Sequence, residues 1–194
     1  MRVSRAQAEA NREAVINVAS RLFREKGFDG IGLKDLMKGA GLTQGGFYKQ
    51  FKSKDDLAAL ASRRALESAT RRWSSVAASS PDPLSAVVDF YLSADHREEM
   101  GDGCPLVALG SDAARQSTDV RTPFQDGIKA HLQVLEELLP DKGSPDANEK
   151  AMVILSLMVG AVTLSRIMTD AHMSDRLLSA AANEVERLAP VERD

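Results

Sequence analysis

Apolar residues recur along this chain at the three- and four-residue spacing that places them on one face of an α-helix. The first such run covers residues 5–26, where Val15, Ala19 and Phe23 share a face, and Gly27 follows as a helix-ending residue. No segment shows the strict alternation of a half-buried strand. The pattern therefore predicts an all-α fold.

Two short helices with a tight turn between them come next. The first is expected over residues 33–40 and ends at Gly41, and Thr43 is the expected N-cap of the second. In that second short helix Phe47 and Phe51 lie four residues apart and form the inward face. A short helix, a glycine-containing turn and another short helix are typical of a helix-turn-helix unit.

A long helix is expected directly afterwards. Ser53 and Asp56 have the spacing of a capping box, and the helical pattern then continues from residue 54 to about residue 78. Residues 79–83, with two prolines, break it. Because no flexible linker precedes the long helix, it should belong both to the helix-turn-helix unit and to the rest of the chain.

The remainder of the chain is also expected to be helical. Further helices are predicted over residues 84–94, over residues 105–115, from a Thr122-Pro123 capping box onward, over residues 148–171, and after Ser174 as a cap. The helix over residues 148–171 is apolar on nearly every side from Met152 to Met168, which predicts that it is buried all round.

The charge of the chain is unevenly distributed. Residues 1–56 hold 11 Lys and Arg against 7 Asp and Glu, a net charge of +4, whereas the remainder holds 14 against 21, a net charge of −7. A basic N-terminal segment on an acidic remainder is expected if only that segment meets phosphate. The overall charge of −3 argues against an indiscriminate polyanion binder.

The cysteine count and the hydropathy of the chain indicate the cellular compartment in which the protein is expected. Cys104 is the single cysteine, so no intrachain disulfide can form. Residues 1–5 lack the apolar run of a signal peptide, and the longest apolar stretch, residues 151–164, falls short of the roughly 20 residues of a membrane span. The three histidines have no zinc-ligand spacing. We therefore expect a cytoplasmic protein without a metal or another cofactor.

The stretch from Thr43 to Lys54 carries the most specific chemistry. Outside the phenylalanine stripe lie Tyr48, Lys49, Lys52 and Lys54, and Gln44 lies near the helix start. This helix would therefore show amide, phenol and ammonium groups outward. Such a surface suits a helix that lies against a DNA duplex. The alternative is an ordinary short surface helix with a basic face.

The order and spacing of these residues resemble the TetR-type family of bacterial transcriptional repressors. The segments that carry the resemblance are residues 14–28, 36–43, 47–51 and 53–57. They cover about 55 residues and are specific in order and spacing, whereas the chain after residue 57 matches only in architecture. Gly32 departs from the family pattern, which usually has Ser or Thr there, so weaker capping of the helix over residues 33–40 and one lost phosphate contact are expected.

The resemblance implies roles at the matching positions. The residues implied to contact DNA are Thr43, Gln44, Gly45, Tyr48, Lys49 and Lys54. The Thr hydroxyl, the Tyr phenol and the ammonium at the N-terminus of the long helix suit phosphate. Gln44, Gly45 and Lys49 are implied to read bases, since Gln can pair with adenine and Lys with guanine in the major groove.

The resemblance also implies a helix-turn-helix DNA-binding domain over residues 1–52 and a helical ligand-binding and dimerisation domain over residues 53–194. One short recognition helix contacts few bases, so a homodimer on a pseudo-palindromic operator is expected. One face of the helix over residues 151–168 can serve the core and another a two-fold interface, which forms a four-helix bundle with the last helix of both copies. The alternative is a monomer with a deeply buried central helix.

A pocket for an unknown small-molecule effector is implied in each body of such a dimer. Candidates by residue type are Trp73, Phe90, Tyr91, Cys104, Leu106, Phe124, His131 and Met158. Each of them can equally be plain core. Cys104 lies at a helix start, which favours its thiolate form, whereas the nearby charge of Asp102 disfavours it. Cys104 can therefore be a sensor of oxidants or electrophiles, or an inert core cysteine.

The implied activity is that of a ligand-responsive repressor. The ligand would tilt the helix over residues 54–78 and so change the distance between two helix-turn-helix units. No nucleophile–base pair or paired carboxylates support catalysis, so an enzyme is not expected. A small helical ligand-binding protein or enzyme that kept the fold without operator binding is the alternative, and use of the fold as an activator or for a protein effector also stays open.

Overall fold

The computed structural model describes residues 4–190, and within them the chain forms ten helices and no strand. In chain order they are α1 (Arg5–Lys26), α2 (Leu33–Gly39), the 3-10 helix η1 (Gln44–Lys49), α3 (Lys54–Ala78), α4 (Pro83–Tyr91), α5 (Ala94–Glu98), α6 (Pro105–Ala113), α7 (Thr118–Leu138), α8 (Ala147–Ile167) and α9 (Ala171–Leu188). The predicted all-α fold is confirmed, and α1 and α3 have the predicted bounds.

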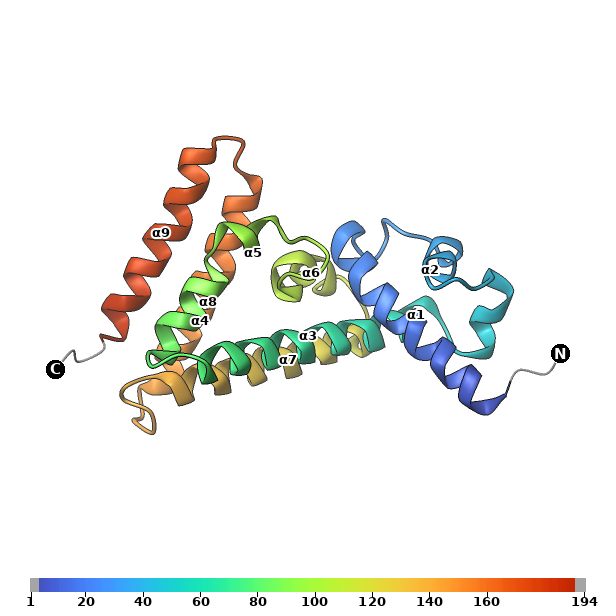
Figure 1. Ribbon diagram of the computed structural model, residues 1–194, viewed down its shortest axis with the longest axis horizontal. Helices are drawn as coiled ribbons and strands as arrows, with labels where there is room; N and C mark the ends of the chain where they lie inside the picture. Colours follow the sequence, from blue (N-terminus) through green and yellow to red (C-terminus); the bar gives the residue numbers. More distant parts are fainter. Residues whose placement is uncertain (1–3, 191–194) are drawn as a thin grey trace.

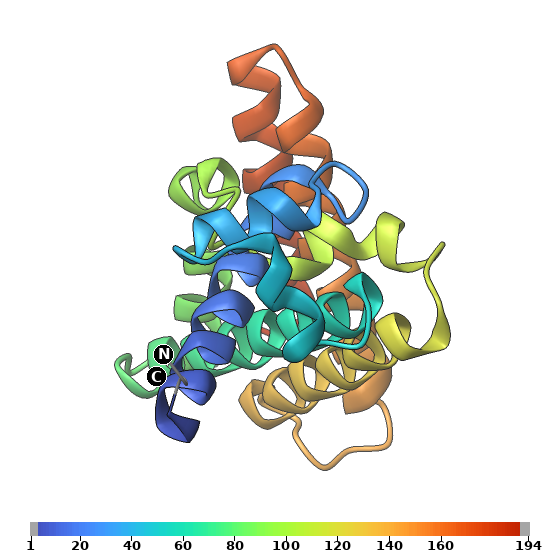
Figure 2. The same cartoon turned by 90° about the vertical axis from the view of Figure 1, so that its right-hand side faces the viewer.

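The molecule is elongated, with a small helical unit at one end (Figure 1). We call α1, α2 and η1 the head, and α4 to α9 the body. The long helix α3 leaves the head and runs beside α7 into the body, while α8 and α9 stand at the far end (Figures 1 and 2). The head is therefore carried on the end of a helix that is also part of the body.

Two groups of buried side chains hold this arrangement together, and α3 contributes to both. Leu57 near the start of α3 packs in one group with Phe47 of the head. Trp73 near the end of α3 packs in the other group, within the body. Leu109 of α6 belongs to the group in the head, so α6 touches the head as well. A tilt of α3 or a shift of α6 must therefore move the head relative to the body.

The recognition element differs from the prediction. Gln44–Lys49 is a 3-10 helix, in which the Gly46 N–H donates to the Thr43 carbonyl at 3.1 Å. Gly45 and Gly46 each cost about 1 kcal/mol relative to Ala in an α-helix, which favours the shorter form. Thr43 is the N-cap, but its side chain makes no capping hydrogen bond. Gly32 gives α2 no side-chain cap either, as predicted.

The start of α7 also differs from the prediction. The helix begins at Thr118 and holds Pro123 inside it, so the Thr122-Pro123 pair opens no helix. The Thr122 hydroxyl donates to the Thr118 carbonyl at 2.9 Å, as a residue within a helix does. Val120 in the added turn is fully buried, and this packing outweighs the one backbone hydrogen bond that a proline removes.

The boundary between α8 and α9 lies earlier than predicted. α8 ends at Ile167, and α9 is capped by Asp170, whose carboxylate accepts the Met173 N–H at 3.0 Å. Ser174 is therefore not a cap. It is buried inside α9, and its hydroxyl donates to the Ser165 carbonyl at 2.8 Å, which ties the two helices together.

The prediction that α8 is buried all round is wrong. Ile154 and Met158 are 0 % exposed, but Val153, Leu164 and Ile167 on another side are 52 %, 49 % and 65 % exposed. Nothing within residues 4–190 covers this second apolar side. Buried and exposed apolar sides give the same sequence pattern, so periodicity could not separate them.

The length argument against a membrane span does not hold for α8. The helix has 21 residues and is long and apolar enough to cross a membrane by length and composition alone. A core helix of a soluble protein passes the same test. α8 packs against α6, α7 and α9 in the body, which is the position of a core helix.

Candidate nucleic-acid interface and effector pocket

The side chains of η1 and its flanks separate into an anchoring set and an outward set. Phe47 and Phe51 are buried, with ring centroids 5.3 Å apart. The guanidinium of Arg12 lies 5.2 Å from the centre of the Phe51 ring. Tyr48 packs edge-on against Phe47, yet it is 72 % exposed. The two phenylalanines therefore fix which way the phenol and its neighbours point.

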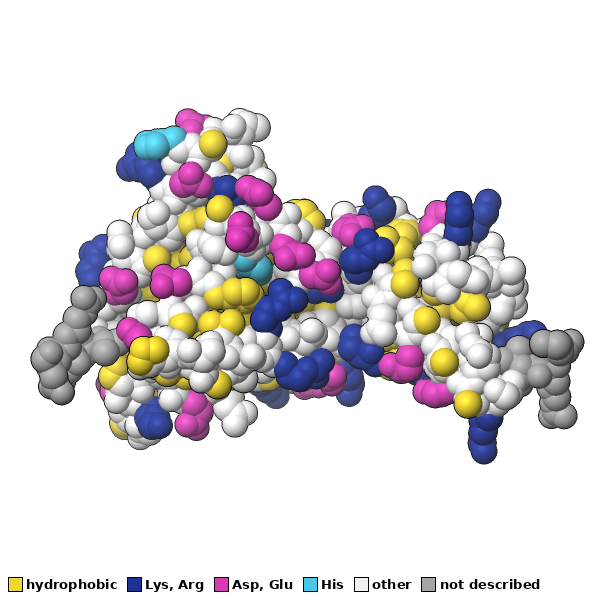
Figure 3. All heavy atoms as spheres, viewed as in Figure 1, with side chains coloured by type: hydrophobic (Ala, Val, Ile, Leu, Met, Phe, Trp, Pro, Cys, Tyr) yellow, Lys and Arg dark blue, Asp and Glu magenta, His cyan; other side chains and the backbone are white. Residues whose placement is uncertain are grey.

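All six residues predicted to contact DNA lie at the surface of this end of the molecule. Thr43, Gln44, Gly45, Tyr48 and Lys49 are exposed, and Lys54 is half-buried. A Cβ placed on Gly45 would meet no atom within 4 Å, so the packing of the protein does not require glycine there. A missing side chain leaves room for a partner to approach the backbone closely. Lys and Arg side chains also project from this end (Figure 3).

The start of α3 is fixed beside η1 by two hydrogen bonds. The Asp56 N–H donates to Ser53 Oγ at 3.1 Å, which confirms Ser53 as the cap. The Asp56 carboxylate accepts from the Lys52 N–H at 3.0 Å rather than from Ser53 itself. The N-terminus of a helix carries partial positive charge, so Lys54 in the first turn adds to an anion-attracting surface.

A second site lies inside the body, where five of the predicted pocket residues come together. Trp73, Phe90, Tyr91, Cys104 and His131 surround a narrow cavity of about 10 Å³. The Trp73 ring meets the His131 ring at 4.5 Å and the Tyr91 ring at 5.3 Å, both edge-on. This volume has room for about one water molecule. An organic ligand can enter only if some of these side chains move.

His96 is part of the same site, although no sequence pattern pointed to it. Its Nδ1 lies 2.6 Å from the Tyr91 carbonyl and its Nε2 accepts the Cys104 N–H at 3.0 Å. Nδ1 therefore carries the proton, because a carbonyl can only accept. Burial lowers the pKa of His96, which keeps this ring neutral.

His131 and Tyr91 each leave a polar atom inside the site without a partner. The Nδ1 of His131 lies 2.7 Å from the Gly127 carbonyl, so its Nε2 is a bare acceptor. The Tyr91 hydroxyl is likewise buried and has no nitrogen or oxygen partner among residues 4–190, although the Cys104 thiol lies beside it. Burial lowers the pKa of His131 and raises that of Tyr91, so both are neutral. Unpartnered buried polar atoms are costly and are common where a ligand binds.

Cys104 is enclosed in this site and is not activated. It is 3 % exposed, and burial raises the pKa of its thiol. The Tyr91 hydroxyl and the backbone of Leu106 and Val107 lower this pKa, but their effect is smaller than that of burial. A thiol with a raised pKa holds little thiolate, the reactive form. Within residues 4–190 no group of three or more His, Cys, Asp and Glu side chains is placed to hold a metal ion.

Comparison with known proteins assigns both halves of the chain to one family. Residues 15–61 match the model of the bacterial regulatory proteins of the tetR family, and residues 82–183 match that of the LmrA/YxaF-like transcriptional regulator C-terminal domain. The chain belongs to the TetR family of transcriptional regulators. The first match contains α2, η1 and the start of α3, and the second contains most of the body. This family is not enzymatic, so the chain is a DNA-binding regulator rather than an enzyme.

Individual relatives agree with this assignment. The chain is 27 % identical to the HTH-type transcriptional regulator LmrA of Bacillus subtilis over 80 % of this chain and 86 % of LmrA. It is 24 % identical to the HTH-type transcriptional repressor NemR of Escherichia coli over 80 % of this chain and 84 % of NemR.

Solved structures show the same fold. Reduced E. coli NemR superposes with a TM-score of 0.80, at 21 % identity and over 95 % of this chain and 100 % of that chain. A TetR regulator from Chloroflexus aurantiacus gives 0.78 at 26 % identity, over 94 % and 97 % of the two chains.

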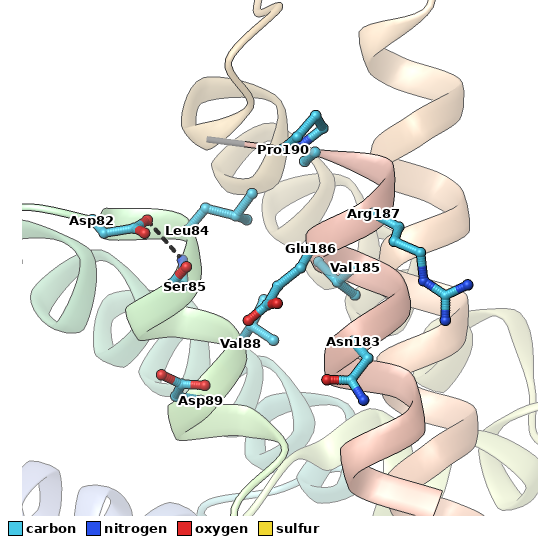
Figure 4. A pocket seen from close by; sticks show the side chains of 11 residues that line it. Asp82, Leu84, Ser85, Val88, Asp89, Asn183, Val185, Glu186, Arg187 and Pro190 are labelled. Carbon is cyan, nitrogen blue, oxygen red and sulfur yellow. Dashed lines mark hydrogen bonds between the residues drawn. The ribbon is translucent and has the colours of Figure 1, made fainter. Parts of the chain in front are cut away.

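The other predicted pocket residues of this TetR-family chain lie outside the Trp73 site. Leu106 and Phe124 line an open groove of about 740 Å³ between α6, α7 and α8, and Met158 is buried in the core of the body. A further hollow of about 440 Å³ lies between α4 and α9, with acidic side chains pointing into it (Figure 4). Of these three sites, the Trp73 site is the one lined by buried polar atoms without a partner.

Proposed function

We propose that this TetR-family regulator is a cytoplasmic, homodimeric repressor that releases its operator when a small molecule enters the Trp73 site. The observation that carries the proposal is the placement of two sites on one helix. α3 begins beside the exposed face of η1, and its Trp73 forms a wall of the pocket. A ligand that moves Trp73 therefore acts on the element that carries the DNA-reading surface.

The uncovered side of α8 supports a dimer. Val153, Leu164 and Ile167 form an exposed apolar strip at helical spacing, and Met173 of α9 is 42 % exposed next to it in the chain. Gly160 shares this side, and a Cβ there would meet nothing within 4 Å, so a second helix can approach closely. Monomeric proteins rarely leave such a strip in water. Two copies that pair α8 and α9 would form a four-helix bundle.

The exposed residues of η1 are then the DNA-reading residues. We assign base contacts to Gln44, Gly45 and Lys49, and phosphate contacts to Thr43, Tyr48 and Lys54. An amide can pair with adenine and an ammonium group with guanine, while hydroxyl and phenol groups donate to phosphate oxygens. Each copy supplies one η1, and a two-fold axis through the α8–α9 bundle makes the operator a pseudo-palindrome.

Release follows from the geometry of two linked heads. They must meet successive major grooves about 34–36 Å apart, so a small tilt of α3 in each copy removes one half-site from reach. The effector shifts the population toward the non-binding arrangement only if it binds that arrangement more tightly. The closed Trp73 cavity supplies this preference, because an organic ligand fits only after the pocket has opened.

The test begins with the wild-type chain and random duplex DNA. Repeated selection should recover one sequence with two related half-sites, and binding to it should weaken steeply with added salt. Tyr48→Phe should weaken this binding because it removes the phosphate-contacting hydroxyl. If no duplex is recovered under any salt condition, the chain is instead a helical ligand-binding protein that kept the fold without operator binding.

A further inference from the structure

The loop before α6, residues 101–104, lies between the pocket and the head. Asp102, Gly103 and Cys104 line one side of the Trp73 site. On the other side the loop packs against the end of α1. A Cβ on Gly101 would come within 2.6 Å of Glu25 Oε1. The loop is therefore a second connection between the two sites, separate from α3.

Arg24 of α1 is the residue that holds this loop. Its guanidinium is almost fully buried, at 7 % exposure, which is unusual for a charged side chain. Nη1 donates to the Gly103 carbonyl at 3.0 Å, and Nη2 lies 3.3 Å from the Asp102 carboxylate. Nε donates to the Ser20 carbonyl within α1 at 3.0 Å, which aims the side chain away from the head core.

A single peptide group joins Arg24 to the pocket. The Gly103 carbonyl, held by Arg24, and the Cys104 N–H, held by His96 Nε2, belong to the same peptide unit. A trans peptide is planar, with its C=O and N–H pointing in opposite directions. Turning the unit to break the bond at the pocket therefore also breaks the bond at the head. His96 itself is tied to Tyr91, whose ring forms the pocket wall.

The loop has little freedom to absorb such a movement. A Cβ on Gly103 would fall 2.1 Å from the Glu99 carbonyl and 2.9 Å from Arg166 Nη2, so no larger residue fits without a shift. Arg166 of α8 donates to the carbonyls of His96, Arg97 and Glu99 at 3.0, 2.8 and 3.1 Å. With its preceding turn fixed in this way, the loop can respond to a ligand chiefly by moving its Gly103–Cys104 end.

We propose that Arg24 is a positioning residue that couples the pocket to the DNA-binding head through the Gly103–Cys104 peptide. The proposal rests on the proposed function, in which a ligand opens the Trp73 site. A ligand that displaces His96 or Cys104 turns this peptide, removes the acceptor of Arg24 and frees the end of α1. The contact belongs to the closed pocket, so it stabilises the operator-binding arrangement.

The reporter for the test is Trp73, the single tryptophan of the chain, which lies in the pocket. Coupling between two sites is reciprocal, so operator binding must also shift the pocket further toward its closed form. Wild-type protein titrated with the selected operator duplex should show a change in Trp73 emission and in its quenching by acrylamide. Arg24→Met keeps the length of the side chain but removes its donors, and it should abolish most of that change.

The same variant should bind the operator about tenfold more weakly, within the range usual for coupling between sites. Arg21→Met is the matched control, since the exposed Arg21 guanidinium pairs with Glu25 on its own helix and Met keeps the Cγ that lies against Gly101. It should leave affinity and the Trp73 response unchanged. Asp102→Asn should act in the same direction as Arg24→Met but more weakly, and it serves in its place if circular dichroism shows that Arg24→Met does not fold.

A double-mutant cycle separates coupling from simple loss of packing. Gly103→Ala displaces the carbonyl that Arg24 holds, so it should weaken operator binding in wild type and add little in the Arg24→Met background. Additive effects, or a Trp73 response that persists in Arg24→Met, would overturn the proposal. Failure of the wild-type protein to bind any duplex would instead show that the proposed function is wrong, and the proposed coupling would then be wrong as well.

Discussion

The head and the pocket use polar side chains in opposite ways. In η1 and just after it the aromatic rings of Phe47 and Phe51 are buried, and the polar groups of Gln44 and Lys49 face solvent. In the Trp73 site the ring of His131 is fully buried against Trp73, and its Nε2 has no partner among residues 4–190. One site is ready to meet its partner, and the other must open to receive one.

Under the proposed function, this difference explains how a ligand regulates DNA binding. A ligand that bound both arrangements of the protein equally tightly would not shift the equilibrium between them. A closed pocket makes opening part of binding, so the ligand favours the open state by construction. The unpartnered polar atoms raise the free energy of the closed state, and a ligand that supplies hydrogen-bond partners removes this penalty.

The largest effect is expected from removing the anchor of the head. Phe47→Ala should cost about 3–5 kcal/mol of unfolding free energy, because it empties a fully buried aromatic position. Operator binding should be lost with the folded head, as measured by denaturant unfolding and duplex titration. Tyr48→Phe is the control, since it removes one exposed hydroxyl and should leave stability unchanged. Equal stability of both variants would contradict an anchored recognition element.

The next effect concerns the uncovered side of α8. Leu164→Glu places like charges opposite one another across the proposed two-fold interface, which costs several kcal/mol and raises the dimer dissociation constant at least about a hundredfold. Sedimentation equilibrium should show monomers. Lys129→Glu adds a negative charge on α7, outside α8 and α9, and should stay dimeric. A dimer that survives Leu164→Glu would place the interface elsewhere.

A smaller effect is expected at the start of α3. Lys54→Ala should weaken operator binding about tenfold and lower the salt slope by about 1, since one phosphate contact disappears. Lys52→Ala is the matched control, because Lys52 is exposed and is expected to be only solvated. Titrations at four or five salt concentrations measure both quantities. If the salt slopes of the two variants are identical, Lys54 makes no contact with DNA phosphate.

The pH dependence of stability should come from the body, because the head has no histidine. Burial lowers the pKa of His96 and His131, so the unfolded chain binds protons more readily once the pH falls below about 6.5. The free energy of unfolding should therefore be highest above that pH and decrease as the pH falls toward the lower pKa values of the folded state. Urea unfolding between pH 7.5 and about 5 tests this. His131→Gln should flatten the decrease, because it removes one of the two buried imidazoles.

The smallest effect is expected at Cys104. Its buried thiol with a raised pKa should react slowly with iodoacetamide under native conditions, and brief exposure should leave operator affinity within about twofold. Mass spectrometry gives the extent of modification. Rapid alkylation together with loss of operator binding would make Cys104 a sensor of electrophiles.

Much of the architecture was readable from the sequence because local signals agreed with packing. Ser53 caps α3 as its spacing with Asp56 predicts, and Gly27 ends α1 with a positive φ of 76°. The helix starts at Thr118 and Ala171 were not readable, because burial of Val120 and capping by Asp170 outweighed the stronger local motifs at Thr122 and Ser174. Local propensity decides where a helix begins only if tertiary packing does not favour another start.

The two sites also differ in how far their residues could be predicted from the sequence. The recognition surface follows from one continuous stretch, so spacing and the family resemblance together could place its residues. The pocket draws on α3, α4, α5, α6 and α7, and residue type could not tell Met158 in the core from Trp73 in the pocket. His96 and Arg24 were missed because their roles depend on partners far along the chain: residues 24 and 103 meet only in three dimensions.

The central claim is that two copies of η1 read one operator. It is tested most directly by native mass spectrometry of the wild-type protein on a duplex selected from random DNA. The account predicts two chains per duplex, on a sequence with two related half-sites separated by about 10 base pairs or a multiple of that spacing. A single chain on a duplex without repeated half-sites would contradict it.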